Sequence, residues 1–362
     1  MMSAWKYKRT TPAALVARLQ LIRQKDLIDL VGKPTSQILS ALAKTPYQRE
    51  IAELPAQELN SLSLEHALLK SFSRTVNEIA QSSPKDIEAL LTQVMKKFEA
   101  DSLKTILRLK SAGMKVDNAK KFVTTFGELD ADRCVTILKN AANVRDVVKL
   151  LSDSEYGPAL EDELAEYDKS REVFLLEVAI DRHLYSSIWK AARKLRGLDG
   201  RIGRTILGLE IDSMNIRVLL RSKEMGISQD QPTRHLLPIS DVFGQKELQA
   251  GIQIDGIEPT IEYLRNVANT NLARDYQYLL AELAEDYSAH KSLSRLENIL
   301  ERGLLKTSLR MLKRYSPFFN IGLVLAFLNS KWCEVRNLRT IIIGAQKGIP
   351  ASRIQEALIL PT

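Results

Sequence analysis

The chain has few of the residues on which metal and redox sites depend. It contains only two cysteines, Cys134 and Cys333, which lie 199 positions apart. We expect both to be buried small apolar residues of a protein from the reducing cytosol. No histidine has a partner at metal-ligand spacing among the four present, which are His66, His183, His235 and His290. The sequence therefore predicts no metal site.

Phosphate-binding and dinucleotide-binding fingerprints are also absent. The sequence has neither G-x-x-x-x-G-K-[ST] nor G-x-G-x-x-G, and no Asp-rich metal loop. Gly197, Gly200 and Gly203 recur at steps of three beside Arg201 and Arg204. These glycines could form a phosphate nest, but a flexible helix start is the favoured interpretation. We predict no catalytic and no cofactor-binding residue, and a helical enzyme is the least favoured of the functional alternatives because no residue can be assigned a chemical role.

No hydrophobic run is long enough to cross a bilayer, which needs about 20 apolar residues. The longest apolar run, residues 321–328, is predicted to be a core helix segment. The N-terminal stretch carries Lys6, Lys8 and Arg9 and does not resemble a signal peptide. If the protein works at a membrane, we expect it to be attached peripherally through its partners, without a transmembrane span of its own.

The net charge of +8 would suit nucleic acid, anionic lipid or acidic protein partners. Most basic residues are interleaved with acids, as on ordinary solvated helices. The densest basic stretch, residues 190–204, is better explained as a solvated helix-to-loop segment than as a binding patch. We therefore predict no nucleic-acid partner, although a nucleic-acid-binding helical protein stays an alternative that salt-dependent binding would reveal.

Apolar residues recur with helical spacing along the chain, and no convincing alternating strand or heptad run is present. The predicted fold class is all-α, with cores that are mostly aliphatic because aromatic residues make up only 6%. A break is expected at Gly157-Pro158, and joints near residues 114–129 and 226–240. The expected helices span residues 14–30, 64–79, 84–111, 133–150, 176–195, 201–225, 258–285, 293–315 and 317–347.

One short pattern occurs three times: an acid, two residues, Asn or Ser, an aliphatic residue, then Lys or Arg. The copies begin at Glu99, Asp212 and Glu334, which are 113 and 122 positions apart. Each acid precedes a glycine by fourteen positions, and we expect these glycines, Gly113, Gly226 and Gly348, to end long closing helices.

Further markers accompany this pattern. A Leu-Glu pair precedes each acid by 34 to 37 positions, at Leu64-Glu65, Leu176-Glu177 and Leu296-Glu297. Ser83-Pro84 and Ser316-Pro317 are typical of an N-cap followed by proline, and Asp199 is the candidate cap of the middle copy. The turns Thr45-Pro46-Tyr47 and Ser154-Glu155-Tyr156 are predicted counterparts. This recurrence predicts an internal triplication, with helical domains at residues 1–120, 121–232 and 233–362.

The repeated acids and bases could form three ion or ligand sites, or polar clasps between helices. We favour clasps that hold each Leu-Glu helix to the closing helix of its own copy. Such clasps predict contact in at least one of three pairs: Glu65–Lys104, Glu177–Arg217 and Glu297–Arg339.

The acid-x-x-Asn-aliphatic-base elements at Glu334-Asn337-Leu338-Arg339 and Asp212-Asn215-Ile216-Arg217 resemble those of the C-subunit family of the A/V-type rotary ATPases (ATP synthases), which is equivalent to the eukaryotic V-ATPase d subunit. The resemblance extends from about Ala14 to the C-terminus. Ser102 departs from the pattern, since the family has Asn there, which leaves the first copy the weakest.

This resemblance implies three related helical domains arranged as a funnel with a central cavity. It also implies a non-catalytic rotor subunit that joins the membrane proteolipid ring to the central-stalk subunits, on the cytoplasmic face of the membrane. Such a protein would transmit torque between ATP synthesis or hydrolysis and the transport of hydrogen or other ions. A helical adaptor or scaffold unrelated to rotary ATPases is the alternative function.

Overall fold

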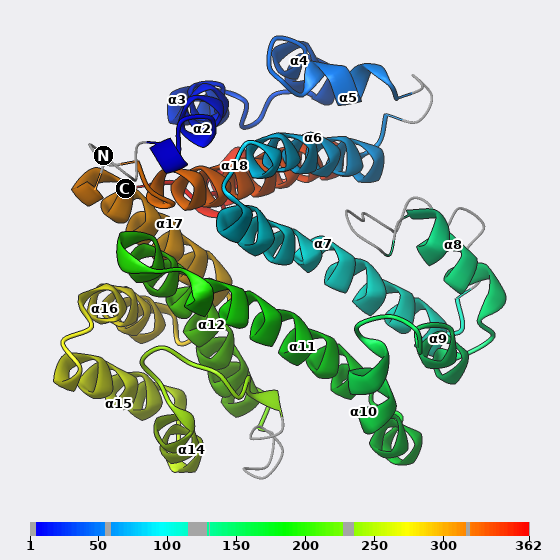
Figure 1. The fold of residues 1–362 in the computed structure, drawn as a ribbon, viewed down its shortest axis with the longest axis vertical. Helices are drawn as coiled ribbons and strands as arrows, with labels where there is room; N and C mark the ends of the chain where they lie inside the picture. The colour runs from blue at the N-terminus through cyan, green and yellow to red at the C-terminus, as the bar shows by residue number, and fades with distance from the viewer. Residues whose placement is uncertain are drawn as a thin grey trace. The chain divides into compact units, whose positions relative to one another are not determined.

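The computed structural model describes residues 5–54, 59–114, 129, 131–226, 235–315 and 319–361. All regular elements in these ranges are helices, which confirms the all-α fold class (Figure 1). The helices are α2 (Thr10–Leu19), α3 (Gln24–Asp29), α4 (Thr35–Leu42), α5 (Gln48–Ala52), α6 (Ser61–Gln81), α7 (Lys85–Ser111), α8 (Ala131–Asn140), α9 (Val144–Leu150), α10 (Gly157–Ser170), α11 (Val173–Lys194), α12 (Gly197–Glu224), α14 (Gln245–Gln253), α15 (Ile257–Thr270), α16 (Arg274–His290), α17 (Leu296–Tyr315), α18 (Gly322–Lys347) and α19 (Ala351–Glu356).

The chain divides into two compact units. The larger unit comprises Met1–Glu88 and Ala192–Thr362, and the smaller unit comprises Ala89–Ala191. The larger unit thus joins the first quarter of the chain to its second half. Segments that are far apart in the sequence share one core there.

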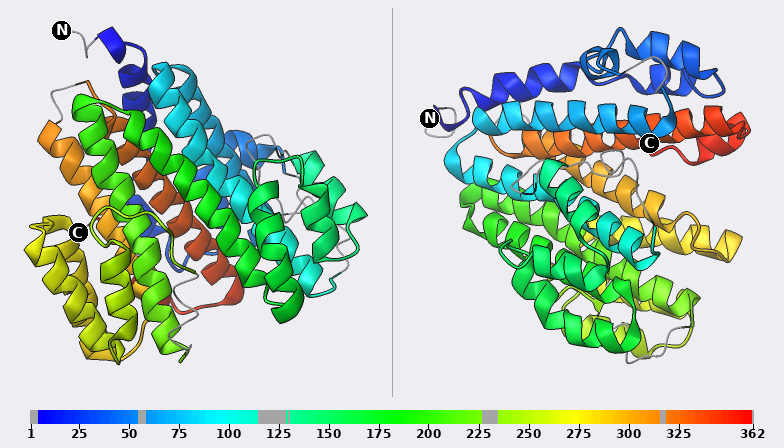
Figure 2. Two further views of the ribbon diagram at one scale, coloured as in Figure 1. Left: turned by 60° about the horizontal axis from the view of Figure 1, so that its bottom comes forward. Right: turned by 90° about the vertical axis from the view of Figure 1, so that its right-hand side faces the viewer.

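In the larger unit, α6 runs alongside α18, as Figures 1 and 2 show, and α2 packs on both helices. A second group consists of α12 and α14 to α17. Its core is mostly aliphatic, as expected, with Phe243 and Tyr276 packed edge to face at 5.4 Å. Helices α12 and α17 both contact α18, so α18 connects the two groups.

The three closing helices end at the predicted glycines. Gly113, Gly226 and Gly348 have φ angles of 63°, 65° and 64°, a left-handed conformation that costs glycine little. After α18 the amide of Ile349 donates to the carbonyl of Gly344 at 2.9 Å, and this bond closes the helix end.

Three expected long helices are each split into two. Residues 14–30 form α2 and α3, residues 133–150 form α8 and α9, and residues 258–285 form α15 and α16. Asn143 starts α9 by accepting a hydrogen bond from the amide of Asp146, and Leu272 breaks the third helix with a φ of 51°. Neither break contains glycine or proline, so helical periodicity runs through both in the sequence.

Two further expectations were wrong. Gly157-Pro158 does not break the chain but begins α10, where proline at the first helical positions costs no hydrogen bond. Helix α14 was not predicted, and α12 begins at Gly197 rather than Arg201. Most of the two joints near residues 114–129 and 226–240, and Ser316-Pro317, lie outside the described residues.

Candidate functional site: three buried acid clasps

The acid of the second copy is completely buried and bound on several sides. Asp212 accepts hydrogen bonds from the amide of Val242 at 2.8 Å, the amide of Asp241 at 3.2 Å and the hydroxyl of Tyr276 at 2.9 Å. Burial raises the pKa of Asp212 to about 7, although these donors act in the opposite direction. Its carboxylate therefore holds α12 to the start of α16 and to the segment that precedes α14.

The acid of the third copy has the same kinds of partner. Glu334 accepts hydrogen bonds from the Tyr47 hydroxyl at 2.8 Å, the Lys331 ammonium at 2.7 Å and the amide of Ile22. The Lys331 ammonium also lies 3.9 Å from the centre of the Tyr47 ring, and burial lowers its pKa. This clasp holds α18 to the N-terminal segment of the chain.

The acid of the first copy lies in the smaller unit. Glu99 is buried and accepts a hydrogen bond from the amide of Leu129 at 3.4 Å, and burial raises its pKa. The pKa of Tyr156 is raised too, first by burial and then by the nearby Glu99 charge. The Tyr156 hydroxyl interacts with the Glu99 carboxylate, but outside the ordinary hydrogen-bond geometry of the other two clasps.

The turns predicted to be counterparts have matching hydrogen bonds. The hydroxyls of Thr45 and Ser154 each donate to the carbonyl three residues earlier, at 2.6 Å in both cases. The tyrosine that lies two residues after each of these hydroxyl residues, Tyr47 or Tyr156, is close to a repeated acid. The equivalent tyrosine of the remaining clasp, Tyr276, was not predicted because it follows Arg274-Asp275 rather than a Thr-x or Ser-x pair.

The asparagines of the pattern clip a later stretch of chain. Asn215 accepts a hydrogen bond from the amide of Leu237 at 2.8 Å and donates to its carbonyl at 3.4 Å. Asn337 does the same with Ile359, at 2.8 Å for both bonds. Each clip spans 22 positions, which is the same distance along the chain. Ser102 is buried at the corresponding place in the first copy.

The predicted ion pairs within each copy do not form, because each Leu-Glu acid pairs with a different closing helix. Glu65 binds Arg339 at 3.0 Å, Glu177 binds Arg108 at 2.6 Å, and Glu297 binds Arg221 at 2.9 Å. The closing helix always comes from the copy that precedes the acid, with the third copy preceding the first. The prediction named the right acids but assigned them to the wrong helices. The partners of the other predicted bases differ as well: Lys104 binds Asp181 at 2.9 Å, and Arg217 contacts the sulfur of Met214.

Two predicted helix caps serve other helices. Asp199 accepts a hydrogen bond from the amide of Ile321 at 3.0 Å, so it caps the start of α18 and not that of α12. Its second oxygen binds Lys6 at 2.9 Å, which also binds Asp86 at 2.8 Å in the first turn of α7. Ser83 donates to the carbonyl of Ile79 at the end of α6.

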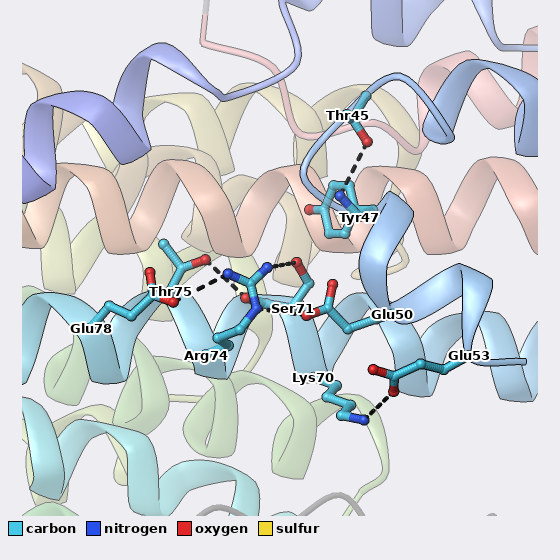
Figure 3. Close-up of polar contacts among 9 residues, drawn as sticks. All are labelled: Thr45, Tyr47, Glu50, Glu53, Lys70, Ser71, Arg74, Thr75 and Glu78. Atoms are coloured by element: carbon cyan, nitrogen blue, oxygen red, sulfur yellow. Dashed lines mark hydrogen bonds and ion pairs between the residues drawn. The ribbon is translucent and has the colours of Figure 1, made fainter.

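A further polar cluster joins α5 to α6 (Figure 3). The guanidinium of Arg74 binds the buried Glu50 at 2.7 Å and Glu78 at 3.3 Å, and Lys70 pairs with Glu53. Figure 3 shows Tyr47 at the start of α5, close to this cluster. The cluster therefore fixes the helix that carries the tyrosine of the third clasp.

The clasps account for the repeated polar residues as contacts between helices. Within the described ranges, no three His, Cys, Asp or Glu side chains are grouped so that they could hold a metal ion. No described helix is both long and apolar enough to span a membrane. Cys134 and Cys333 are buried as expected, and burial raises the pKa of Cys333 to about 12.

The repeated acids thus act as contacts between helices in an all-helical protein, and comparison with known proteins identifies its family. A model of the ATP synthase (C/AC39) subunit family matches residues 16–357. The chain belongs to this family, which confirms the resemblance and agrees with the prediction of a non-catalytic subunit of a rotary ATPase.

Curated relatives are named as the C subunit of A-type ATP synthases. The protein of Methanocaldococcus jannaschii is 26% identical over 340 residues, which cover 94% of this chain and 80% of the relative. The Methanothermobacter thermautotrophicus protein is 24% identical over 90% of this chain and 83% of the relative. The Haloferax volcanii protein is 24% identical over 97% of this chain and 98% of the relative. The similarity thus extends over nearly the whole chain.

Proposed function

We propose that the chain is the rotor subunit that joins the membrane proteolipid ring to the central stalk of an A/V-type ATPase. In this role it would transmit torque between ATP synthesis or hydrolysis and ion transport. The family match over residues 16–357 is the observation that carries the proposal. The relatives are named as ATP synthase subunits, and the two partners come from the resemblance to the C-subunit family of the rotary ATPases.

We propose an internal triplication, with copies at residues 1–120, 121–232 and 233–362. Support comes from the repeated acid–tyrosine–amide clasp, the asparagine clips and the left-handed glycines. In this arrangement the copies are interlocked, because each closing helix binds the copy that follows it. The third closing helix binds the first copy through Ile22 and Tyr47.

We propose that the three copies surround a central cavity in a funnel that receives the foot of the stalk. A torque link must resist bending, and the long closing helices suit this task. Helices α7, α12 and α18 have 27, 28 and 26 residues, which corresponds to about 40 Å each. Buried clasps fix each closing helix near its middle, where bending would otherwise start.

We place the protein on the cytoplasmic face of the membrane as a peripheral component. The nearest support is that no described helix meets the length and hydrophobicity that a membrane span requires. Attachment would then depend on contacts with the proteolipid subunits.

Crosslinking in native membranes, followed by identification of the attached chains, tests this function. We expect crosslinks to proteolipid subunits and to central-stalk subunits within the same complex. A matched sample in which the membranes were first stripped of the ATPase should lose both sets. Crosslinks confined to proteins outside the rotary ATPase would contradict the proposal and favour an adaptor or scaffold.

A further inference from the structure

A pocket of about 280 Å³ lies in the larger unit beside the Asp212 clasp. Three helices and the segment before α14 contribute to its wall, and Tyr276, whose hydroxyl binds Asp212, is one of the lining residues. Four arginines also line it: Arg201 from α12, Arg274 from α16, and Arg310 and Arg314 from α17. None of the clasps or clips described above uses these arginines.

The charge in the pocket is only partly balanced. Asp275 binds Arg310 and accepts a hydrogen bond from the Thr307 hydroxyl at 3.0 Å, so its carboxylate is already engaged. The other acid in the wall, Asp241, lies 3.4 Å from the Tyr276 hydroxyl. Within the described part of the chain, Arg310 is paired with Asp275, whereas Arg201, Arg274 and Arg314 make no ion pair. Three of the four arginines that line the pocket therefore have no carboxylate partner, although all four are exposed and the Arg314 guanidinium lies 5.5 Å from the centre of the Tyr315 ring.

The backbone adds to this positive character. Helix α16 begins at the pocket wall, and no side chain caps its N-terminus. The first amides of a helix lack intrahelical partners and carry partial positive charge. Leu272, at the rim, holds the preceding turn with a φ of 51°.

We propose that this pocket binds a small phosphate-bearing anion through its diphosphate or triphosphate group. Planar guanidinium groups bind phosphate oxygens in pairs, which suits arginines from three helices around one hollow. The volume lies near the lower end of the range of ligand pockets, about 300 Å³. It accommodates the phosphate groups, whereas the rest of a nucleotide would extend outside. The inference does not depend on the proposed function.

The glycines that suggested a phosphate nest in the sequence serve another purpose. A Cβ atom at Gly200 would lie 2.4 Å from the carbonyl oxygen of Leu195, and one at Gly203 would lie 3.2 Å from the Leu195 side chain. Gly200 therefore needs glycine for close packing, whereas a Cβ atom at Gly203 would require the Leu195 side chain to shift by a few tenths of an ångström. Arg201, from the same stretch, supplies a pocket arginine through its side chain rather than through a backbone nest.

Titration calorimetry of the full chain at low salt tests the proposal. Inorganic pyrophosphate, ATP and orthophosphate are the probes, and an acidic peptide is the comparison ligand. We expect saturable binding of pyrophosphate and ATP and weaker binding of orthophosphate, because fewer phosphate oxygens meet the arginines. Similar affinity for pyrophosphate and ATP would assign recognition to the phosphates alone, and tighter ATP binding would identify a nucleotide as the source.

The variant Arg201→Gln/Arg314→Gln should bind pyrophosphate at least about tenfold more weakly. Arg265→Gln, on α15 outside the pocket, is the matched control and should bind like the wild type. Asp275→Asn should have the opposite effect and tighten binding, because it frees Arg310. No saturable binding of pyrophosphate, equal losses in the control, or binding of the acidic peptide alone would overturn the proposal.

The rise in melting temperature on adding pyrophosphate gives a second readout that also reports folding. It should be clear for the wild type and Arg265→Gln, and small for the double variant. If the double variant is unfolded, the single variants Arg201→Gln and Arg314→Gln decide. A full ligand-induced rise in both single variants would also contradict the site.

Discussion

Among single residues, the buried carboxylate of Asp212 most clearly links stability to pH. Its pKa is about 7 in the folded protein, against an ordinary value of 3.8. The folded state therefore holds this proton more tightly than the unfolded state. The resulting stabilisation is fully present below about pH 4 and is lost as the pH rises toward 7.

Asp212→Asn should remove this pH dependence, because an amide cannot lose the proton but its oxygen can still accept hydrogen bonds from Val242 and Tyr276. Relative to the wild type, the free energy of unfolding of the variant should rise by up to about 4 kcal/mol between pH 4 and pH 8. Urea denaturation across this range measures the difference. Asp29→Asn, at an exposed position on α3, is the control, and curves for Asp212→Asn that parallel the wild type would contradict the account.

Removal of a single asparagine side chain from a clip should lower the free energy of unfolding strongly. Asn337→Ala leaves the buried amide and carbonyl of Ile359 without their partner, which should cost about 2–4 kcal/mol of unfolding free energy. Asn266→Ala, at an exposed position on α15, should cost less than about 1 kcal/mol. Denaturation midpoints of both variants test the comparison, and equal losses would show that the clip contributes nothing particular.

The repeated pattern and its spacing in the sequence identified the acids of the clasps and the asparagines of the clips. Their periodicity placed polar groups at the border of buried helix faces, which is costly unless they have partners. The sequence did not identify the hydrogen-bond partners of these polar groups. Backbone amides such as those of Val242 and Ile22 leave no signature in a sequence, and Tyr276 lacks the Thr-x or Ser-x context of the other two tyrosines.

For the helices, periodicity predicted type and approximate extent well but missed the breaks. The ends at Gly113, Gly226 and Gly348 were correct because a left-handed residue after a helix favours glycine. The break at Leu272 was missed because a leucine in a left-handed conformation is held by its surroundings and not by its own preference.

The pairing of helices can be tested with double-mutant cycles. Alanine substitutions at Glu297 and Arg221 should show a coupling free energy of about 0.5 kcal/mol, since both side chains are about one-third exposed and solvent weakens the pair. The cycle of Glu297 with Arg339, which would pair within one copy, should show none. Coupling in the second cycle and none in the first would restore pairing within a copy.

For the whole molecule, the sequence predicted the recurring pattern but not which closing helix each Leu-Glu helix binds. A hydrophobic stripe shows which face of a helix is buried, but not which helix covers it. Each Leu-Glu helix could meet its own closing helix or the preceding one without any change in pattern. Only the ion pairs at Glu65, Glu177 and Glu297 reveal the choice.

The biological role depends on a different kind of information. The clasps explain how helices are held together, and the family match assigns the chain to a rotary ATPase as one of its subunits. The ring and the stalk are the partners that we propose from the resemblance to the C-subunit family.

The central structural claim is that the N-terminal segment completes the bundle that contains α18. Hydrogen exchange of a variant lacking residues 1–23 tests it most directly, because the deletion removes the Ile22 amide that binds Glu334 and the whole of α2, with all its contacts to α18. We predict exchange at least about tenfold faster in α18 around Glu334, with unchanged protection in α9 and α10 of the smaller unit. Unchanged protection in α18, or an equal loss in α9 and α10, would contradict the claim.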